Sequence, residues 1–510
     1  MAQALRTMRL GSETYPIVLP SLRDPRLHLA AVIISVHILG QTALGFRVSV
    51  PQILSAIFTC SLIEVVWVFR KNKQIVWPAS AMLTGSGVAL ILRLVGVERG
   101  DHWTWRGWHI FAVAAGLSLV SKYVIRYRGL HLFNPSNLGL VVAFLVLGSN
   151  VIEPLDFWWA PLNPGMVAAY LIILIGGLLI TARLKLLAMA ATFWLSLATG
   201  LAILTASGHC ITAAWSLRPV CGFDFWRVVM TSPELLIFLF FMITDPKTIP
   251  TGRSPRILFS VLLGIACTLL IASQRTEFGA KVGLLAGLVL LTPLRFVIDR
   301  FFARQSIMFN SVRRAFLGGL ATGATVVVLA AGIVVAGIPA REPAFASSFA
   351  APAVNVKVDA DSLPNVTVGP EVAALNSDAA YEPEQVAIDL AEALLVENEA
   401  MRNADTSLLR SVSEGARLLA MERAIEAAAV AGRPVVTEYS FATLQLDVVF
   451  TNGTQGGASL AMEAAGSVTK IEYDTAGIEL DRSQAPFASV FVLSPGNGDR
   501  WLIAAEIDPS

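Results

Sequence analysis

The sequence predicts a polytopic α-helical membrane protein that continues into a C-terminal α+β domain outside the membrane. Three observations favour this fold class. The 510-residue chain is 55% hydrophobic and only 15% charged, a composition that would leave a soluble globule with far too much exposed apolar surface. Long apolar runs recur as far as residue 339. Residues 1–340 carry a large basic excess and residues 341–510 a large acidic one, so the net charge of +1 conceals two modules.

Eleven apolar segments are candidate spans, because a helix needs about 20 apolar residues per crossing. They are residues 28–46, 50–69, 75–97, 108–124, 134–149, 164–182, 185–206, 232–246, 255–273, 278–298 and 315–339. The segments 134–149 and 232–246 are too short to cross unaided. The expected domains are a cytoplasmic segment 1–26, a transmembrane core 27–300, an additional span within 301–340, an Ala/Pro/Ser-rich linker 341–380 and the α+β domain 381–510.

The basic residues predict the orientation. With a cytoplasmic N-terminus, the inner loops collect most of the Lys and Arg residues, in agreement with the positive-inside rule. The aromatic clusters "DHWTWRGW" and "LDFWWAP" then lie on the outer side, as interfacial belts do. An odd number of spans places the C-terminal domain outside the cytoplasm. We therefore expect a multi-pass protein of the bacterial inner membrane with an extracytoplasmic C-terminal domain, and the lipid bilayer as its first partner.

Two cysteines share one predicted outer loop, "SGHCITAAWSLRPVCGFDFW". A disulfide between Cys210 and Cys221 would suit an oxidising compartment. The sequence leaves this pairing open, because it gives no distance between the two residues. Cys60 and Cys267 lie inside apolar spans, where a small buried side chain is the simpler interpretation.

The C-terminal domain begins with two segments of helical period, "EPEQVAIDLAEALLVENEAMRNAD" and residues 407–431. The remainder alternates as strands and includes the hairpin turn "PGNGD". Helices followed by a strongly curved antiparallel meander resemble the NTF2-like, cone-shaped fold. No charged constellation in this domain indicates catalysis, so we expect it to bind a protein or a small ligand.

Polar side chains inside the membrane are costly, and each is a functional candidate by default. Glu64 stands near the basic end of the second span, where pairing with Arg70 or Lys71 is the simpler interpretation. Arg93 stands near the outer end of its span and is expected to snorkel. No CxxC, HExxH or phosphate-loop motif occurs, so no metal, haem c or iron–sulfur site is expected. Nucleic acid is not an expected partner.

Two short stretches beside the interrupted segments are the strongest site candidates. They supply the predicted ligand-binding residues Asn134, Pro135, Ser136 and Asn137 in "LHLFNPSNLGL", and Thr244, Asp245 and Thr248 in "FMITDPKT". Asparagine followed by proline is a favourable helix start. Paired broken helices indicate a binding site in transporter-like folds, because free helix ends offer N–H and C=O groups to a ligand. The alternative is two interfacial helix caps, with Asp245 solvated beside Lys247.

At these residues the chain resembles the membrane protein family shared by the Rnf complex (RnfD) and the sodium-pumping NADH:quinone reductase (NqrB). The resemblance covers about residues 27–300 and rests on "PASAMLTGSGVALIL", "FNPSN", "MITDPKT", "SPRILFSVLLGIACTLLI" and "EFGAKVGLLAGLVLLTPLRFVIDR", in that order. Within this family the chain is similar to the RnfD-like membrane proteins of enediyne biosynthetic clusters, through "GQTALGF", "SKYVIRYRGLHLFNPSNLGLV", "IEPLDFWWAP" and "SQRTEF".

The resemblance implies a ten-helix core with internal inverted repeats and, in the electron-transport members, a membrane-bound flavin. Those members attach FMN to a threonine of an SGAT stretch that precedes the TDP helix. The corresponding loop here, about residues 207–230, lacks that threonine context. Non-covalent FMN or riboflavin is therefore the expected cofactor, rather than covalent FMN.

The implied function is flavin-linked transmembrane electron transfer with redox or biosynthetic partner subunits, in the service of enediyne-type natural-product biosynthesis. Two alternatives stay open. One is a transporter or permease that uses the same cavity without redox chemistry, and the other is a membrane scaffold with an outer binding module. The sequence singles out no catalytic residue.

Overall fold

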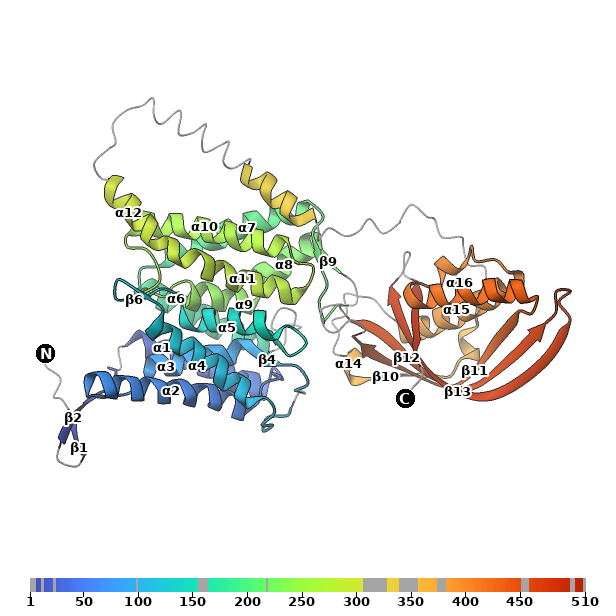
Figure 1. Cartoon of the computed structure of the whole chain (residues 1–510), viewed down its shortest axis with the longest axis horizontal. Coiled ribbons are helices and arrows are strands. Elements are labelled where there is room, and N and C mark those ends of the chain that lie inside the picture. Colours follow the sequence, from blue (N-terminus) through green and yellow to red (C-terminus); the bar gives the residue numbers. More distant parts are fainter. Residues whose placement is uncertain are drawn as a thin grey trace, which may run out of the picture. The chain divides into compact units, whose positions relative to one another are not determined.

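The computed structural model describes residues 6–10, 13–21, 24–97, 100–154, 164–216, 219–305, 328–338, 356–373, 382–450, 458–495 and 500–507. The chain divides into two compact units. The first comprises Met1–Ile211 and Cys221–Arg341, and the second comprises Thr212–Val220 and Glu342–Ser510. The first unit is helical and the second contains the large sheet (Figure 1). Most of the predicted linker 341–380 lies outside the described residues.

The helices of the first unit mostly begin and end close to the predicted segments. They are α1 (Pro25–Thr42), α2 (Val50–Asn72), α3 (Ala79–Ile91), α4 (Trp108–Val124), α5 (Pro135–Leu147), α6 (Pro164–Arg183), α7 (Leu187–Ala206), α8 (Gly222–Thr231), α9 (Pro233–Ile237), the π-helix η1 (Phe238–Met242), α10 (Arg253–Ala272), α11 (Glu277–Leu291), the 3₁₀ turn η2 (Thr292–Leu294) and α12 (Arg295–Gln305).

Five helices in the described part of the chain are long and apolar enough to cross a membrane, or six if the bent pair of α8 with α9–η1 forms one span. The five are α2, α6, α7, α10 and the continuous segment Glu277–Ala303. These helices make the chain a multi-pass membrane protein, as its composition predicts. The expectation of eleven spans is met only in part, because α3, α4 and α5 are shorter apolar helices. Of the predicted span 315–339, only Val328–Gly337 is a described helix.

One predicted span ends early. The segment 75–97 is helical only as α3, and Leu92–Leu94 leaves the helix as strand β4, antiparallel to β7 (Ile152–Pro154). The pairing of Arg93 with Glu153 and of Leu94 with Ile152 gives backbone groups that leave the helix new hydrogen-bond partners. Arg93 does not snorkel as predicted, because it forms an ion pair with Glu153 across these two strands.

Small residues bring the helices close together. A Cβ atom added at Gly85 of α3 would lie 2.5 Å from the carbonyl oxygen of Ala56 in α2. A Cβ atom at Gly139 of α5 would lie 1.7 Å from Ser118 Oγ in α4. Such contacts let two backbones approach closely, which drives helix association in membranes.

Short strands also occur outside the large sheet. They are β1 (Arg6–Leu10), β2 (Glu13–Val18) and β3 (Ile75–Val76) in one sheet, β5 (Arg126–Tyr127) with β6 (Leu130–His131), and β8 (Cys210–Ile211) with β9 (Val220–Cys221). A disulfide joins Cys210 of β8 to Cys221 of β9. The pairing that the sequence left open is thus formed.

The second unit holds a five-stranded mixed sheet in the order β10-β11-β12-β13-β14. Its strands are β10 (Val366–Val368), β11 (Val435–Val449), β12 (Ser459–Tyr473), β13 (Glu479–Pro495) and β14 (Trp501–Ile507). The antiparallel meander β11–β14 follows the prediction, whereas the parallel strand β10 was not foreseen.

Two helices, α15 (Pro383–Asn403) and α16 (Gly415–Ala431), lie over the curved sheet (Figure 1). Leu390 of α15 and Phe491 of β13 belong to the buried core between helix and sheet. The second helix starts at residue 415 rather than 407, because a 3₁₀ turn (Leu409–Ser411) precedes it. Most of the predicted turn "PGNGD" lies outside the described residues.

Candidate functional site

A cavity of about 530 Å³ lies among the N-terminal ends of α1 and α5, one face of α3 along its length, and η1 with the segment that follows it. This size is typical of small-molecule and cofactor sites. Its polar and charged lining residues are Asp24, Arg26, Ser80, Thr84, Lys122, His131, Asn134, Ser136, Thr244, Asp245 and Lys247. Its apolar lining includes Leu90 and Ile91 of α3 and Phe240, Phe241 and Met242, which end the interrupted helix α9–η1.

The two predicted stretches meet at this cavity, although more than a hundred residues separate them. The predicted residues that line it are Asn134, Pro135, Ser136, Thr244 and Asp245. The Asn134 side chain caps α5 by accepting a hydrogen bond from the Asn137 N–H at 3.3 Å, and its Nδ2 donates to the carbonyl of Met242 at 3.3 Å. One side chain therefore both starts α5 and holds the end of η1.

A second link joins the same two segments. His131 Nε2 lies 3.4 Å from Asp245 Oδ2, and the other oxygen of that carboxylate accepts from the Lys247 N–H at 3.0 Å. Asp245 is therefore more than a solvated carboxylate beside Lys247. Only the first stretch is a helix cap, because Asn134 begins α5, whereas Asp245 lies in a turn and the next helix begins at Arg253; both stretches line one cavity.

Two predicted residues lie just behind the cavity wall. Asn137 is buried and donates from Nδ2 to the carbonyl of Leu285 in α11 at 2.9 Å. Thr248 is also buried, and its hydroxyl donates to the carbonyl of Asp245 at 3.2 Å. Neither side chain lines the cavity, so their geometry suits positioning rather than direct contact with a ligand.

The backbone beside Asp245 is unusual. Residues Phe238–Met242 form a π-helix, and the Thr244 hydroxyl donates to the carbonyl of Phe240. Single π-helical turns occur frequently at functional sites. Upstream, α8 and α9–η1 bend by 44° between Thr231 and Pro233, where proline has no N–H to continue the helical ladder.

Arg295, at the start of α12, was not singled out from the sequence. Its guanidinium is almost fully buried and donates to the carbonyl of His131 at 3.3 Å and to the carbonyl of Lys247. It therefore fixes the backbone on both sides of the His131–Asp245 contact. His131 itself stands three residues before Asn134, and this proximity was a usable signal.

The prediction that Glu64 pairs with Arg70 or Lys71 is wrong. Glu64 Oε1 accepts from Lys122 Nζ at 2.9 Å and from the Tyr123 hydroxyl at 3.1 Å, both on α4. Its Oε2 accepts from the N–H of Ala81 at 2.9 Å, in the first turn of α3. A carboxylate is stabilised at that position by the helix dipole. Lys122 lines the cavity, so this buried ion pair supports the cavity rim.

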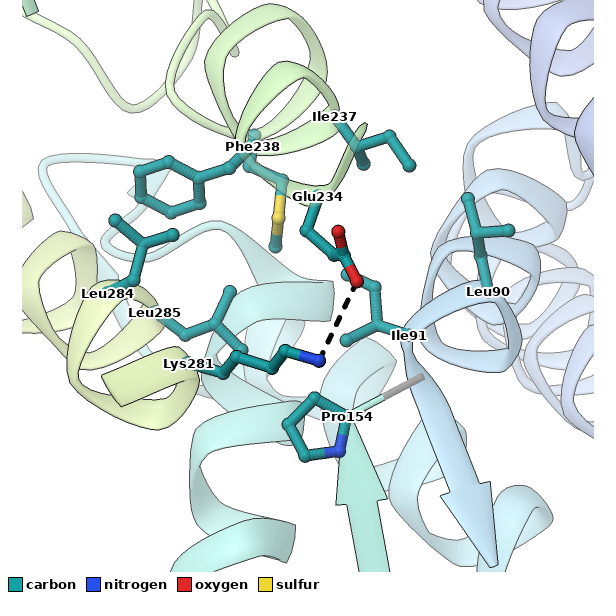
Figure 2. A pocket seen from close by; sticks show the side chains of 10 residues that line it. Leu90, Ile91, Pro154, Glu234, Ile237, Phe238, Lys281, Leu284 and Leu285 are labelled. Atoms are coloured by element: carbon teal, nitrogen blue, oxygen red, sulfur yellow. Dashed lines mark ion pairs between the residues drawn. The ribbon is translucent and has the colours of Figure 1, made fainter. Parts of the chain in front are cut away.

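A smaller pocket of about 40 Å³ shares part of its wall with the cavity. Leu90, Ile91, Ile237 and Met242 line both spaces. Figure 2 shows Glu234 and Lys281 facing each other in the smaller pocket, with Lys281 Nζ 3.7 Å from Glu234 Oε1. The two spaces thus share four apolar lining residues, and each also has charged residues in its wall.

No protein-family model matches the chain, and no curated protein matches it either.

Proposed function

We propose that this chain is a membrane protein of the RnfD/NqrB type that binds a flavin non-covalently in the 530 Å³ cavity and transfers electrons across the membrane. One observation carries the proposal: "FNPSN" and "MITDPKT", distant in sequence, line the same cavity. The proposal includes a core of ten membrane-embedded segments built as inverted repeats, an eleventh span, and an NTF2-like domain outside the bacterial inner membrane.

The residues present fit a flavin. The isoalloxazine ring has one edge of carbonyl and N–H groups and one apolar edge. The cavity offers both kinds of surface: the side chains of Asn134, Ser136 and Thr244 can hydrogen-bond a polar edge, and Phe240 and Phe241 can contact an apolar one. In the first turn of α5, Pro135 has no N–H and the Asn137 N–H is bonded to Asn134, which leaves the N–H of Ser136 and the helix dipole to favour an electron-rich or anionic group.

A bound flavin supplies the electron transfer, and the protein supplies position and polarity. In the proposed site, Asn134 and Ser136 bind and orient the polar edge of the ring. The His131–Asp245 pair can hold a proton at His131 Nε2, beside the ligand. The apolar wall of Leu90, Ile91 and Met242 excludes water from the far side of the cavity.

The proposed partners follow from the resemblance to the RnfD-like proteins of enediyne clusters. They are redox or biosynthetic subunits in the membrane, with enediyne-type biosynthesis as the process served. The outer domain is proposed to bind a protein or a small ligand, because it adds a folded unit that the family core does not need.

The visible spectrum of detergent-purified protein, recorded before and after acid precipitation, tests the proposal. We expect flavin absorbance that moves into the supernatant, because nothing attaches the cofactor covalently. Asp245→Asn removes the charge that partners His131 and should reduce the flavin retained per protein by about tenfold, as expected for the loss of a charged hydrogen-bond partner. The matched control Asp224→Asn alters an exposed carboxylate away from the cavity and should retain flavin.

Transport without redox chemistry is the second candidate, and the shared apolar wall favours it. Hydrophobic constrictions between polar spaces gate several membrane pathways by dewetting. Leu90, Ile91, Ile237 and Met242 line both the cavity and the Glu234–Lys281 pocket, and in this second candidate function they would act as the gate between the two spaces. A colourless wild-type preparation would reject the redox proposal and leave transport as the function of this cavity.

A further inference from the structure

A groove of about 470 Å³ runs along the last turns of α2, away from the cavity described above. Its lining residues are Leu62, Ile63, Val66, Trp67, Arg70 and Lys71. They form two rows with a spacing of four residues, and each row begins with an aliphatic side chain and ends with a cation. Residues four apart lie on the same helix face, so each row is a continuous surface strip. At 1.5 Å per residue the strip is about 13 Å long.

The apolar part of the strip faces outwards. Leu62 is 52% exposed, and the stripe continues towards the start of α2 with Leu54 and Phe58, which are also exposed. Because α2 is one of the candidate membrane spans, this exposed stripe is a surface for acyl chains. Trp67 stacks on Tyr123 of α4 with ring centroids 4.8 Å apart, and aromatic residues near the end of a spanning helix are typical of the membrane–water interface.

The charged part of the strip is not neutralised. Arg70 and Lys71 are exposed, and neither forms an ion pair with a carboxylate in the described part of the chain. Lys122, by contrast, is paired with Glu64. Two unpaired cations above an apolar strip complement a phosphate group attached to acyl chains. Basic pockets beside membrane helices bind anionic headgroups in this way.

We propose that this groove binds an anionic phospholipid, with an acyl chain along Leu62 and Val66 and the phosphate between Arg70 and Lys71. Cations in the last turn of a helix also complement the helix dipole. That effect stabilises α2 equally in any lipid, whereas the proposed site distinguishes an anionic headgroup from a zwitterionic one.

Lipid titration of the full-length protein in dodecylmaltoside micelles tests the proposal. The thermal unfolding midpoint is recorded while phosphatidylglycerol or phosphatidylcholine is added, and each concentration for half-maximal shift gives an apparent affinity. We expect the wild type to prefer phosphatidylglycerol. In Arg70→Gln/Lys71→Gln this preference should fall by roughly 25-fold, because each cation near an anionic lipid surface contributes about fivefold.

The control variant Arg253→Gln/Arg300→Gln removes the same charge from two exposed arginines that do not line the groove, and it should keep the wild-type preference. Free glycerol 3-phosphate should produce no shift, because it lacks acyl chains. Equal shifts with the two lipids in the wild type, or an undiminished preference in Arg70→Gln/Lys71→Gln, would overturn the proposal. The unfolding midpoint in phosphatidylcholine alone shows whether each variant is folded.

Discussion

His209 lies between the end of α7 and the Cys210–Cys221 disulfide, outside the spanning helices. Its ring is fully buried and packs on Phe225 with centroids 5.0 Å apart. Neither ring nitrogen has a hydrogen-bond partner among the described residues. Burial alone lowers the pKa of His209 to about 4, because the charged imidazolium would lose its hydration without gaining a partner.

This histidine makes the stability of the protein depend on pH. Below its ordinary pKa of 6.5 the unfolded chain binds a proton at His209, whereas the folded chain does not until the pH approaches 4. The His209 contribution is therefore complete above pH 6.5 and is lost as the pH falls, the loss reaching about 2 kcal/mol at pH 5. Thermal unfolding in detergent at pH 7 and pH 5 measures this loss.

The variant His209→Phe keeps the buried ring and has no proton to bind, so its unfolding midpoint should fall less than that of the wild type between pH 7 and pH 5. His109→Phe alters an exposed histidine and should behave as the wild type does. An identical pH response in wild type and His209→Phe would contradict the assignment.

Individual residues also show what the sequence can reveal about the site. Asn134 and Asp245 could be singled out because their signals are local. Asn134 precedes a proline at the start of one short apolar segment, and Asp245 precedes a proline at the end of another. The partners of Glu64 and Arg93 could not be foreseen. Sequence reasoning assigned neighbours or solvent to them, whereas the actual partners, Lys122 and Glu153, stand 58 and 60 positions further along the chain.

At the scale of elements, structure that depends on a continuous stretch of sequence could be predicted, whereas structure that depends on a distant partner could not. Hydropathy placed α2, α4, α6, α7 and α10 closely, because each is a continuous apolar run. It extended α3 to residue 97, since nothing local marks the change to β4. That strand pairs with Ile152–Pro154, and a partner so far along the chain cannot be recognised from the local sequence.

Close packing of α3 on α2 gives a prediction for an element. Gly85→Ala would place a Cβ atom 2.5 Å from the Ala56 carbonyl, a backbone atom that cannot move without shifting α2. We expect a loss of stability of about 1–3 kcal/mol, as for other overpacked cores. The thermal unfolding midpoint in detergent measures this change.

Gly332→Ala is the matched control, because Gly332 also lies in a helix and an added Cβ would meet no atom of the described residues within 4 Å. It should be neutral or slightly stabilising, since alanine favours helix over glycine by about 1 kcal/mol. Equal midpoints for Gly85→Ala and Gly332→Ala would show that the α2–α3 contact is looser than described.

The whole molecule joins two units of opposite charge. Basic residues dominate the sequence as far as residue 340, acidic residues dominate beyond it, and the division into compact units falls at Arg341. Composition alone could place this boundary, because the apolar, basic sequence of the first unit changes there to the acidic sequence of the second. It could not supply strand β10, which is only three residues long and pairs with β11 far along the chain.

The charge distribution predicts on which side of the membrane each unit lies. Loops rich in Lys and Arg resist translocation, so the basic end of α2 should remain in the cytoplasm. The expected odd number of spans then places the C-terminal unit outside. A reporter that folds only in the cytoplasm should be active when fused after Lys73 and inactive when fused after Ser510. An enzyme that needs an oxidising compartment should give the opposite pattern. The Cys210–Cys221 disulfide provides an independent check, because after reduction the thiol of Cys221, the more exposed of the two, should react with a membrane-impermeant reagent added from outside. Cytoplasmic-reporter activity after Ser510 would overturn the odd number of spans, whereas loss of that activity after Lys73 would overturn the orientation itself.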